Sequence, residues 1–325
     1  MFQNIKLKNI IFLCVASYLI YFHSHLAYGE TLNFQYEKAL ISFNEKQFKT
    51  AKIHIKNSIN QNPKHLPTRI LNARLLLIFG KGHEAEVELN KTLRWGADRA
   101  YILSFLMEAL LQQRKFDQVL EYYENYFTSD RQFKDDTMSL YQAEALVGKH
   151  SYHKAERVYL EILRESPSNL KAILGRAQIW LKKGKPLHSL ALVEAALKID
   201  DSNINVLLMS ASLHQMTGET TVAKSSVLKV LELDPKNSPA KFIYSVILLE
   251  SGDLLAAKNE LEQILTILPN EPGANYLKYL TTISLGYSSE SEQTLSHLTN
   301  VLGSIPEKIK EDFPIFYYLS SLVEF

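Results

Sequence analysis

The stretch SPSNLKAILGRAQIWLKKGKPLHSLALVEAALKIDDSN, residues 166–203, decides the fold. It contains two apolar segments with helical spacing, and Gly184 between them ends the first. The position of Pro167 recurs at intervals of 34 residues, where it is occupied by Asp201, Pro235 and Pro269. Each of these four residues is followed by a polar pair. Self-similarity at a fixed period of this length is typical of a solenoid of short helical repeats.

Extending this frame in both directions gives eight repeats. The frame needs one two-residue insertion, in the polar stretch FTSDRQFKDD at residues 127–136, where we expect a longer loop. The repeats start at Leu32, Leu66, Ala100, Asp136, Leu170, Ile204, Ser238 and Pro272.

Three positions of the frame predict that each repeat is a helix-turn-helix unit. Position eight, where the two helices come closest, is small in every repeat except those with Met107 and Tyr279. Position twenty, where the second helix packs on the first, is compact in all eight, and position fifteen, at the turn, is glycine in five. Apolar stripes on the second helices, with Tyr159 and Leu261 among them, are expected to be core.

These residues resemble the tetratricopeptide repeat family over residues 32–305. The resemblance implies an all-α fold, a right-handed superhelical solenoid of about eight helix-turn-helix repeats plus a C-terminal helix. Because a single repeat cannot bury its own faces, we expect one continuous stacked array over residues 30–305, with no boundary inside it. Residues 306–325 are expected to form the capping helix.

A narrower resemblance lies in the N-terminal half. KNSINQNP at residues 56–63, GADRA at 96–100 and QQRKFDQVL at 112–120 are similar to the tetratricopeptide lipoprotein family associated with PEP-CTERM and exosortase systems. That resemblance implies a scaffold in the Gram-negative envelope, in exopolysaccharide export or exosortase-type protein sorting. Members of that family are longer and carry a lipidation box, which this chain lacks.

The first 29 residues predict a signal peptide. Lys6 and Lys8 precede an apolar run at residues 10–22, and Ala27 and Gly29 form a cleavage site before Glu30. The run is shorter than the roughly 20 residues that span a bilayer core, which favours cleavage. Retention as a membrane anchor is the alternative. We therefore expect an exported, periplasmic protein, with membrane association if the segment stays attached.

Composition argues against several classes of function. The 36 Lys and Arg residues balance the 35 Asp and Glu residues, so no nucleic-acid partner is expected. The only cysteine, Cys14, lies in the signal segment behind Phe12 and Leu13, which do not fit a lipidation box. His150 and His153 are expected to be solvated turn histidines, and no catalytic motif, cofactor site or metal site is predicted.

The predicted binding surface is the concave face, which the first helix of each repeat lines with positions two, five, nine and twelve. Position nine changes from charged to apolar along the chain, and in the seventh and eighth repeats the lining is wholly apolar and suits an amphipathic helix or an extended apolar segment. The alternative for this apolar part is tighter packing within the fold. The candidate partner-binding residues are Arg74, Glu108, Glu144, Gln178, Phe242, Val246, Leu249, Tyr276, Leu280 and Ile283. A carboxylate clamp is not expected, because no repeat carries Lys at position five with Asn at position nine.

The tail KEDFPIFYYLSSLVEF predicts a final helix with Asp312 as N-cap and Pro314 in the first turn. We expect it to pack on the eighth repeat, although its apolar face also suits docking or self-association, or would allow it to fill the apolar groove.

The sequence thus predicts a non-enzymatic scaffold that binds other proteins in the bacterial envelope. A periplasmic holding chaperone, which would bind exported apolar segments in the groove, is the alternative, and a regulatory arm of a separate enzyme is a third reading. Oligomeric state is not predicted.

Overall fold

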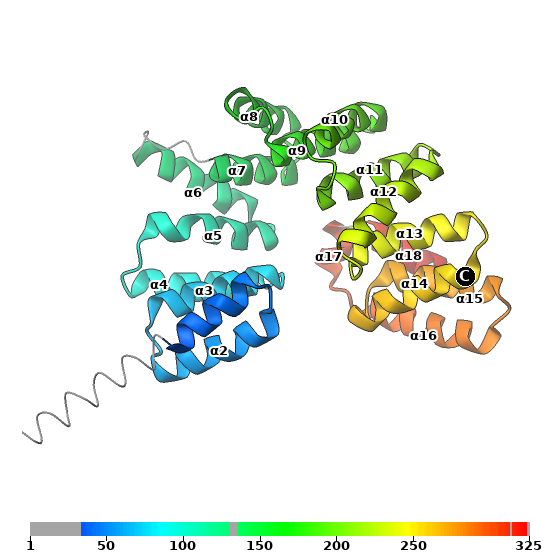
Figure 1. Ribbon diagram of the computed structural model, residues 1–325, viewed down its shortest axis with the longest axis horizontal. Helices are drawn as coiled ribbons and strands as arrows, with labels where there is room; N and C mark the ends of the chain where they lie inside the picture. The colour runs from blue at the N-terminus through cyan, green and yellow to red at the C-terminus, as the bar shows by residue number, and fades with distance from the viewer. Residues whose placement is uncertain (1–33, 130–135, 313, 324–325) are drawn as a thin grey trace, which may run out of the picture. The chain divides into compact units, whose positions relative to one another are not determined.

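A computed structural model describes residues 34–129, 136–312 and 314–323 of the chain. Within these ranges the regular structure is entirely helical (Figure 1), which confirms the all-α prediction. None of the helices in these ranges is long and apolar enough to cross a membrane. The predicted signal segment, residues 1–29, lies outside the described residues.

The helices alternate as first and second members of the predicted repeats. The first helices are residues 34–44, α3 (Leu66–Ile78), α5 (Arg99–Gln112), α7 (Asp136–Gly148), α9 (Leu170–Lys182), α11 (Ile204–Met216), α13 (Ser238–Glu250) and α15 (Pro272–Ser284). The second helices are α2 (Phe48–Gln61), α4 (Gly82–Arg94), α6 (Phe116–Ser129), α8 (Tyr152–Glu165), α10 (Pro186–Ile199), α12 (Thr220–Leu233), α14 (Leu254–Ile267) and α16 (Ser288–Ser304). Every second helix begins at position seventeen of the frame. The predicted loop at 127–136 is partly wrong, because α6 continues to Ser129 and α7 begins at Asp136.

Polar residues before α5, α9, α11, α13 and α15 explain where these first helices begin. The side chains of Asn169 and Asn237 accept hydrogen bonds from the backbone amides of Ala172 (3.1 Å) and Ala240 (3.0 Å). Such N-caps satisfy amides that have no partner inside the helix. The recurring polar pair after Pro167 and its equivalents therefore sets the helix starts.

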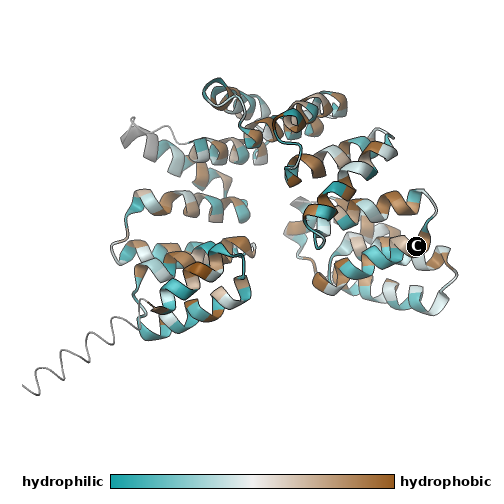
Figure 2. Cartoon of the chain, in the orientation of Figure 1, coloured by the Kyte–Doolittle hydropathy of each residue, from teal (hydrophilic) through white to brown (hydrophobic). Residues whose placement is uncertain are grey.

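The contact between the two helices of a repeat depends on the small residues at positions eight and twenty. From Ala39 to Ser245 the residues at position eight are fully buried, and so are those at position twenty from Ala51 to Ala257. Larger side chains there would separate the helices, so these positions fix the interhelical distance. Figure 2 shows apolar and polar residues interleaved along the helices, as expected where one face packs and the other meets solvent.

Position fifteen has a left-handed backbone in all eight repeats. Five of these residues are the predicted glycines, but Lys46, Arg114 and His150 adopt the same conformation, with φ between 57° and 59°. The following amide then bonds back to the carbonyl at position eleven, as in Lys81 to Leu76 (2.9 Å) and Lys185 to Trp180 (3.0 Å). This is the Schellman closure of a helix C-terminus.

The chain divides into two compact units, residues 1–162 and 163–325, where the sequence predicts a single array. We name them the N-terminal and C-terminal units. The core of the N-terminal unit includes Leu75, Ile102 and Met107, and that of the C-terminal unit includes Val193, Val227 and Leu261. The division falls within α8.

The C-terminal tail forms two helices, α17 (Glu307–Asp312) and α18 (Ile315–Val323), in place of the single predicted helix. Asp312 is the last residue of α17, and the residue directly before α18 is Pro314, so the predicted N-cap position is wrong. The carbonyl of Pro314 accepts a hydrogen bond from the amide of Tyr318 (3.2 Å), so α18 starts at this proline, which has no amide hydrogen to continue a preceding helix. Leu319 of α18 is buried with Leu298 and Leu302 of α16, which confirms the predicted packing on the eighth repeat.

Candidate functional site

In the N-terminal unit, the first helices present an arginine held between aromatic rings. The guanidinium carbon of Arg74, on α3, lies 4.8 Å from the ring centroid of Phe43 and 5.6 Å from that of Phe105 on α5. Arg74 is half-buried, and among the described residues no hydrogen bond or ion pair engages its guanidinium. Its planar group is therefore fixed by cation–π contacts while its N–H donors stay available.

Two tyrosines complete this arrangement, which we call the aromatic–arginine cluster (Tyr36, Phe43, Arg74, Tyr101 and Phe105). Tyr101 is 57% exposed and meets Phe105 edge to face, with 5.9 Å between ring centroids. Burial raises the pKa of Tyr36, the nearby Tyr101 raises it further, and Arg74 opposes the shift. These electrostatic effects place the three groups near one another on the faces of three successive first helices.

The two predicted acidic residues of this unit lie on the next first helices. The Glu108 carboxylate, on α5, accepts a hydrogen bond from the hydroxyl of Tyr141 on α7 (3.3 Å). Glu144 is exposed on α7, and its charge adds to the burial that raises the pKa of Tyr159. Arg74, Glu108 and Glu144 thus occupy the same repeat position on three successive first helices. Tyr159 itself is 2% exposed, which confirms that it belongs to the core.

The aromatic part of this cluster was only partly predictable from the sequence. Phe43 stands at position twelve, one of the four positions predicted to line the concave face, whereas Phe105 stands at position six, which is not among them. The sequence pattern that indicates this cluster is an arginine at position nine with aromatic residues in the repeat before it and in the repeat after it.

The predicted apolar groove of the C-terminal unit is only partly open. Phe242 packs against Leu261, Ile264 and Ala274, and its ring lies where a side chain at Gly273 would have to fit. Tyr276 packs with Leu298, Leu302 and Leu319, and burial raises its pKa, with the neighbouring Tyr318 adding to the shift. The tail helix α18 therefore covers one end of the groove.

The remaining predicted residues of this unit stay accessible. Leu280 is 38% exposed and Ile283 is 50% exposed, both on α15. Val246 and Leu249 are half-buried on α13, and Gln178 is exposed on α9. A short apolar strip on α13 and α15 is what remains of the groove.

The two predicted turn histidines lie at the junction of α7 and α8, with His150 at the left-handed position and His153 in the first turn of α8. His150 and His153 are exposed, as expected for solvated residues, and a ring nitrogen of His150 lies 2.9 Å from the hydroxyl of Tyr152.

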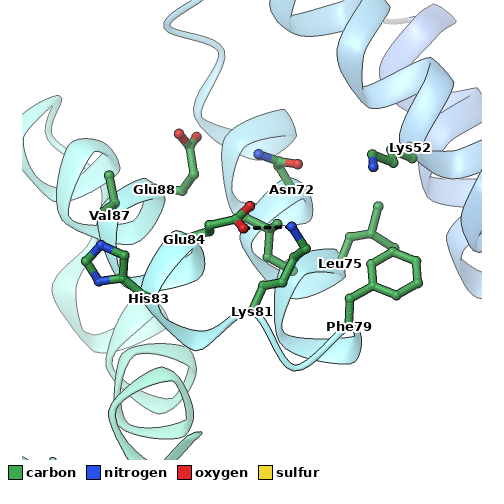
Figure 3. Close-up of a pocket in the computed structure, with 10 residues that line it drawn as sticks. Lys52, Asn72, Leu75, Phe79, Lys81, His83, Glu84, Val87 and Glu88 are labelled. Atoms are coloured by element: carbon green, nitrogen blue, oxygen red, sulfur yellow. Dashed lines mark hydrogen bonds and ion pairs between the residues drawn. The ribbon is translucent and has the colours of Figure 1, made fainter. Parts of the chain in front are cut away.

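A separate hollow lies on the outer side of the N-terminal unit, between the second helices α2 and α4 and above α3. Its volume is about 450 Å³, within the range of roughly 300–1,000 Å³ that is usual for binding pockets. Leu75, Leu76, Phe79 and Val87 supply its apolar lining. Figure 3 shows Lys52 and Phe79 on one side and Val87 and His83 on the other, with the Lys81–Glu84 ion pair (2.7 Å) between them.

Glu88 lies at the buried edge of this hollow. Its carboxylate is 2.8 Å from Arg69 and 3.0 Å from Lys91. Burial by itself would raise the pKa of Glu88, but the hydrogen bonds from Lys91 and Arg69 outweigh it and lower the pKa. Glu88 therefore stays ionised and is neutralised by its own partners.

Comparison with known proteins gives likenesses in structure only. No family model matches the chain, and no curated protein matches it. A tetratricopeptide repeat protein from Parabacteroides merdae is 15% identical with a TM-score of 0.53, covering 80% of this chain and 99% of that one. A crystal structure of the APC/C hetero-tetramer Cut9–Hcn1 is 12% identical with a TM-score of 0.58, covering 84% of this chain and 59% of that one. The narrower PEP-CTERM resemblance is not confirmed. With the repeat geometry described above, these likenesses show that the chain has the tetratricopeptide repeat fold.

Proposed function

We propose that this chain is a non-enzymatic scaffold that holds partner proteins on the first helices of its N-terminal unit. The observation that carries this proposal is Arg74, which is stacked between two phenylalanine rings while its N–H groups have no acceptor among the described residues. Ordering a flexible side chain on binding normally costs conformational entropy. Because the Arg74 side chain is already ordered, a partner that accepts its hydrogen bonds binds without that cost. Exposed Tyr101 beside it adds the aromatic surface that is enriched where proteins bind one another.

The proposed setting is the bacterial cell envelope, in exopolysaccharide export or exosortase-type sorting. The signal-like residues 1–29 and the similarity of residues 56–63, 96–100 and 112–120 to envelope proteins support this setting. The protein would reach the periplasm with its first-helix faces free to organise an assembly.

A holding chaperone is the second candidate, and the accessible strip with Leu280 and Ile283 favours it. This strip is short because α18 covers the Tyr276 end. Phe242 and Tyr276 are unsuitable for testing it, since both pack in the core of the unit and their replacement by Asp would disturb the fold.

An in-cell crosslinking experiment distinguishes the two proposed functions. A tagged chain is captured by affinity from the envelope fraction, and the proteins crosslinked to it are identified. A scaffold recovers a small fixed set of envelope proteins, and Arg74→Glu loses that set while the Leu280→Asp/Ile283→Asp double variant keeps it. A chaperone recovers a diffuse set of exported chains, which the double variant loses. Recovery of the same fixed set by Arg74→Glu at wild-type yield would refute the scaffold site.

A further inference from the structure

The outer hollow between α2 and α4 contains apolar side chains that the repeat fold does not require. Phe79, at position fourteen, is 48% exposed, and no other repeat has an aromatic residue at that position. Val87, at position twenty-two, is 39% exposed, whereas the third to eighth repeats carry Glu, Arg, Ala, Ser, Asn and Gln there. The first repeat carries Ile53 at position twenty-two and the eighth carries Leu285 at position fourteen. The third to seventh repeats form the same helix pairs without a large apolar residue at either position, so packing within a repeat does not require these groups.

The position of Phe79 is nevertheless well defined. Its ring meets that of Phe48, at the start of α2, edge to face with 6.2 Å between centroids. Phe48 in turn meets Phe43 with 5.8 Å between centroids. Phe79 is thus held at the rim by the preceding repeat and presents its free face to the hollow.

The uncompensated charge of the hollow is positive. Glu84 is paired with Lys81, and Glu88 is paired with both Arg69 and Lys91. Lys52, which lines the hollow from α2, has no hydrogen bond or ion pair among the described residues. Its ammonium group stands on the same side as Phe79 (Figure 3), so an apolar contact and an uncompensated positive charge lie together.

We propose that this hollow is a second docking site, which binds a segment of a partner protein carrying a large apolar side chain next to a carboxylate. The apolar side chain enters between Leu75, Phe79 and Val87, and the carboxylate pairs with Lys52. Charge complementarity selects an acidic segment, because the two carboxylates already present are neutralised and the remaining cation is not. A volume of about 450 Å³ accommodates a few side chains and not a whole helix.

This site shares no residue with the aromatic–arginine cluster, although Phe48 contacts both Phe79 of the hollow and Phe43 of the cluster. An α-helix turns by about 100° per residue, so Arg74 points to the side of α3 opposite Asn72, Leu76 and Phe79. A partner on the outer hollow therefore leaves the first-helix face free, and the scaffold would hold two partners on opposite sides of one repeat.

Titrations followed by fluorescence anisotropy test the proposal with short fluorescein-labelled peptides added to the whole chain. The probe peptides carry a Phe-Asp or Asp-Phe pair between Gly and Ser residues, and the comparison peptides carry Ser-Asp or Phe-Asn. We expect the better Phe and Asp probe to bind at least about tenfold more tightly than either comparison peptide. Lys52→Glu and Phe79→Gln, the latter introducing the residue that Gln113 supplies in the third repeat, each weaken binding about tenfold.

Two control variants define specificity. Lys224→Glu makes the same charge change at the same repeat position in the C-terminal unit, and Arg74→Ala removes the cation of the aromatic–arginine cluster. Both variants should leave the affinity within about twofold of wild type. Circular dichroism confirms that each variant keeps its helical content. Equal binding of all four peptides, absence of binding up to their solubility limit, or wild-type affinity of Lys52→Glu would overturn the docking site. Loss of probe binding in Arg74→Ala would instead place the peptide on the first-helix face.

Discussion

The guanidinium of Arg74 lies over the ring of Phe105, with 5.6 Å between the guanidinium carbon and the ring centroid, although the two residues belong to successive repeats. Since this contact joins α3 to α5, it should contribute to stability as well as to the proposed binding. A double-mutant cycle with Arg74→Met and Phe105→Leu should give a coupling of about 0.5–1 kcal/mol in the free energy of unfolding by urea. Arg74→Lys should lose part of that coupling, because an ammonium group cannot stack as a plane. Strictly additive effects of the two substitutions would show that the contact is not energetically significant.

Because position fifteen has a left-handed backbone, removing a side chain there should raise the free energy of unfolding, and adding one should lower it. Lys46→Gly should raise the free energy of unfolding by about 0.5–1 kcal/mol, because a left-handed backbone costs a non-glycine residue about 1–2 kcal/mol and the entropy of glycine offsets part of the gain. Gly184→Ala should lower it by about 1 kcal/mol, and purely by backbone strain, since no atom lies within 4 Å of the added Cβ. Urea titrations followed by circular dichroism measure both. Stabilisation by Gly184→Ala would contradict the left-handed turn.

Because the pKa of Glu88 is lowered in the folded state, we expect the free energy of unfolding to fall in acid. Its pKa in the folded state lies below the ordinary value of 4.5, because hydrogen bonds from Lys91 and Arg69 outweigh the burial that would raise it. The stabilisation from its ionised form is thus fully present above 4.5 and is lost as the pH falls through the lower folded-state pKa. Glu88→Gln should therefore destabilise the chain by about 1–3 kcal/mol at neutral pH and reduce the dependence of unfolding on acid.

Glu84→Gln is the matched control for Glu88→Gln. Glu84 is 55% exposed and, among the residues that the structure describes, pairs with Lys81 alone, so its replacement should change stability by less than about 1 kcal/mol. If both variants show the same acid dependence as the wild type, the lowered pKa of Glu88 is not linked to folding.

The attachment of α18 to the eighth repeat should depend on Leu319, the one buried side chain of this helix. It is 7% exposed between Leu298 and Leu302, and no other residue of α18 is buried. Leu319→Ala should cost about 2–3 kcal/mol of local stability, and Leu319→Asp should detach the helix. Hydrogen exchange of the α18 amides measures this directly. Tyr318→Ala, which removes a 60% exposed side chain, should leave their protection nearly unchanged.

The local structure of each repeat was predictable from the sequence. The period of 34, the polar pair at the caps and the small residues at positions eight and twenty act within one helix pair, so they predict the helix starts and the buried contacts wherever they recur. The left-handed turn was predictable only where glycine marks it. At Lys46, Arg114 and His150 the closure of the helix imposes the same conformation on residues that do not favour it.

Contacts between repeats were decided only by the tertiary structure. Position nine placed Arg74 on a binding face, but the rings that hold it come from the repeats before and after, and no local pattern specifies that meeting. The same is true of the tail, where Leu319 reaches α16 and α18 covers Tyr276. The outer hollow combines Phe79 and Val87, which both stand in the second repeat, with a lysine from the preceding second helix. Helix formation and capping depend on neighbours along the chain, whereas a site depends on which side chains packing brings together, and this is why the sequence determined the repeats and the tertiary structure determined the sites.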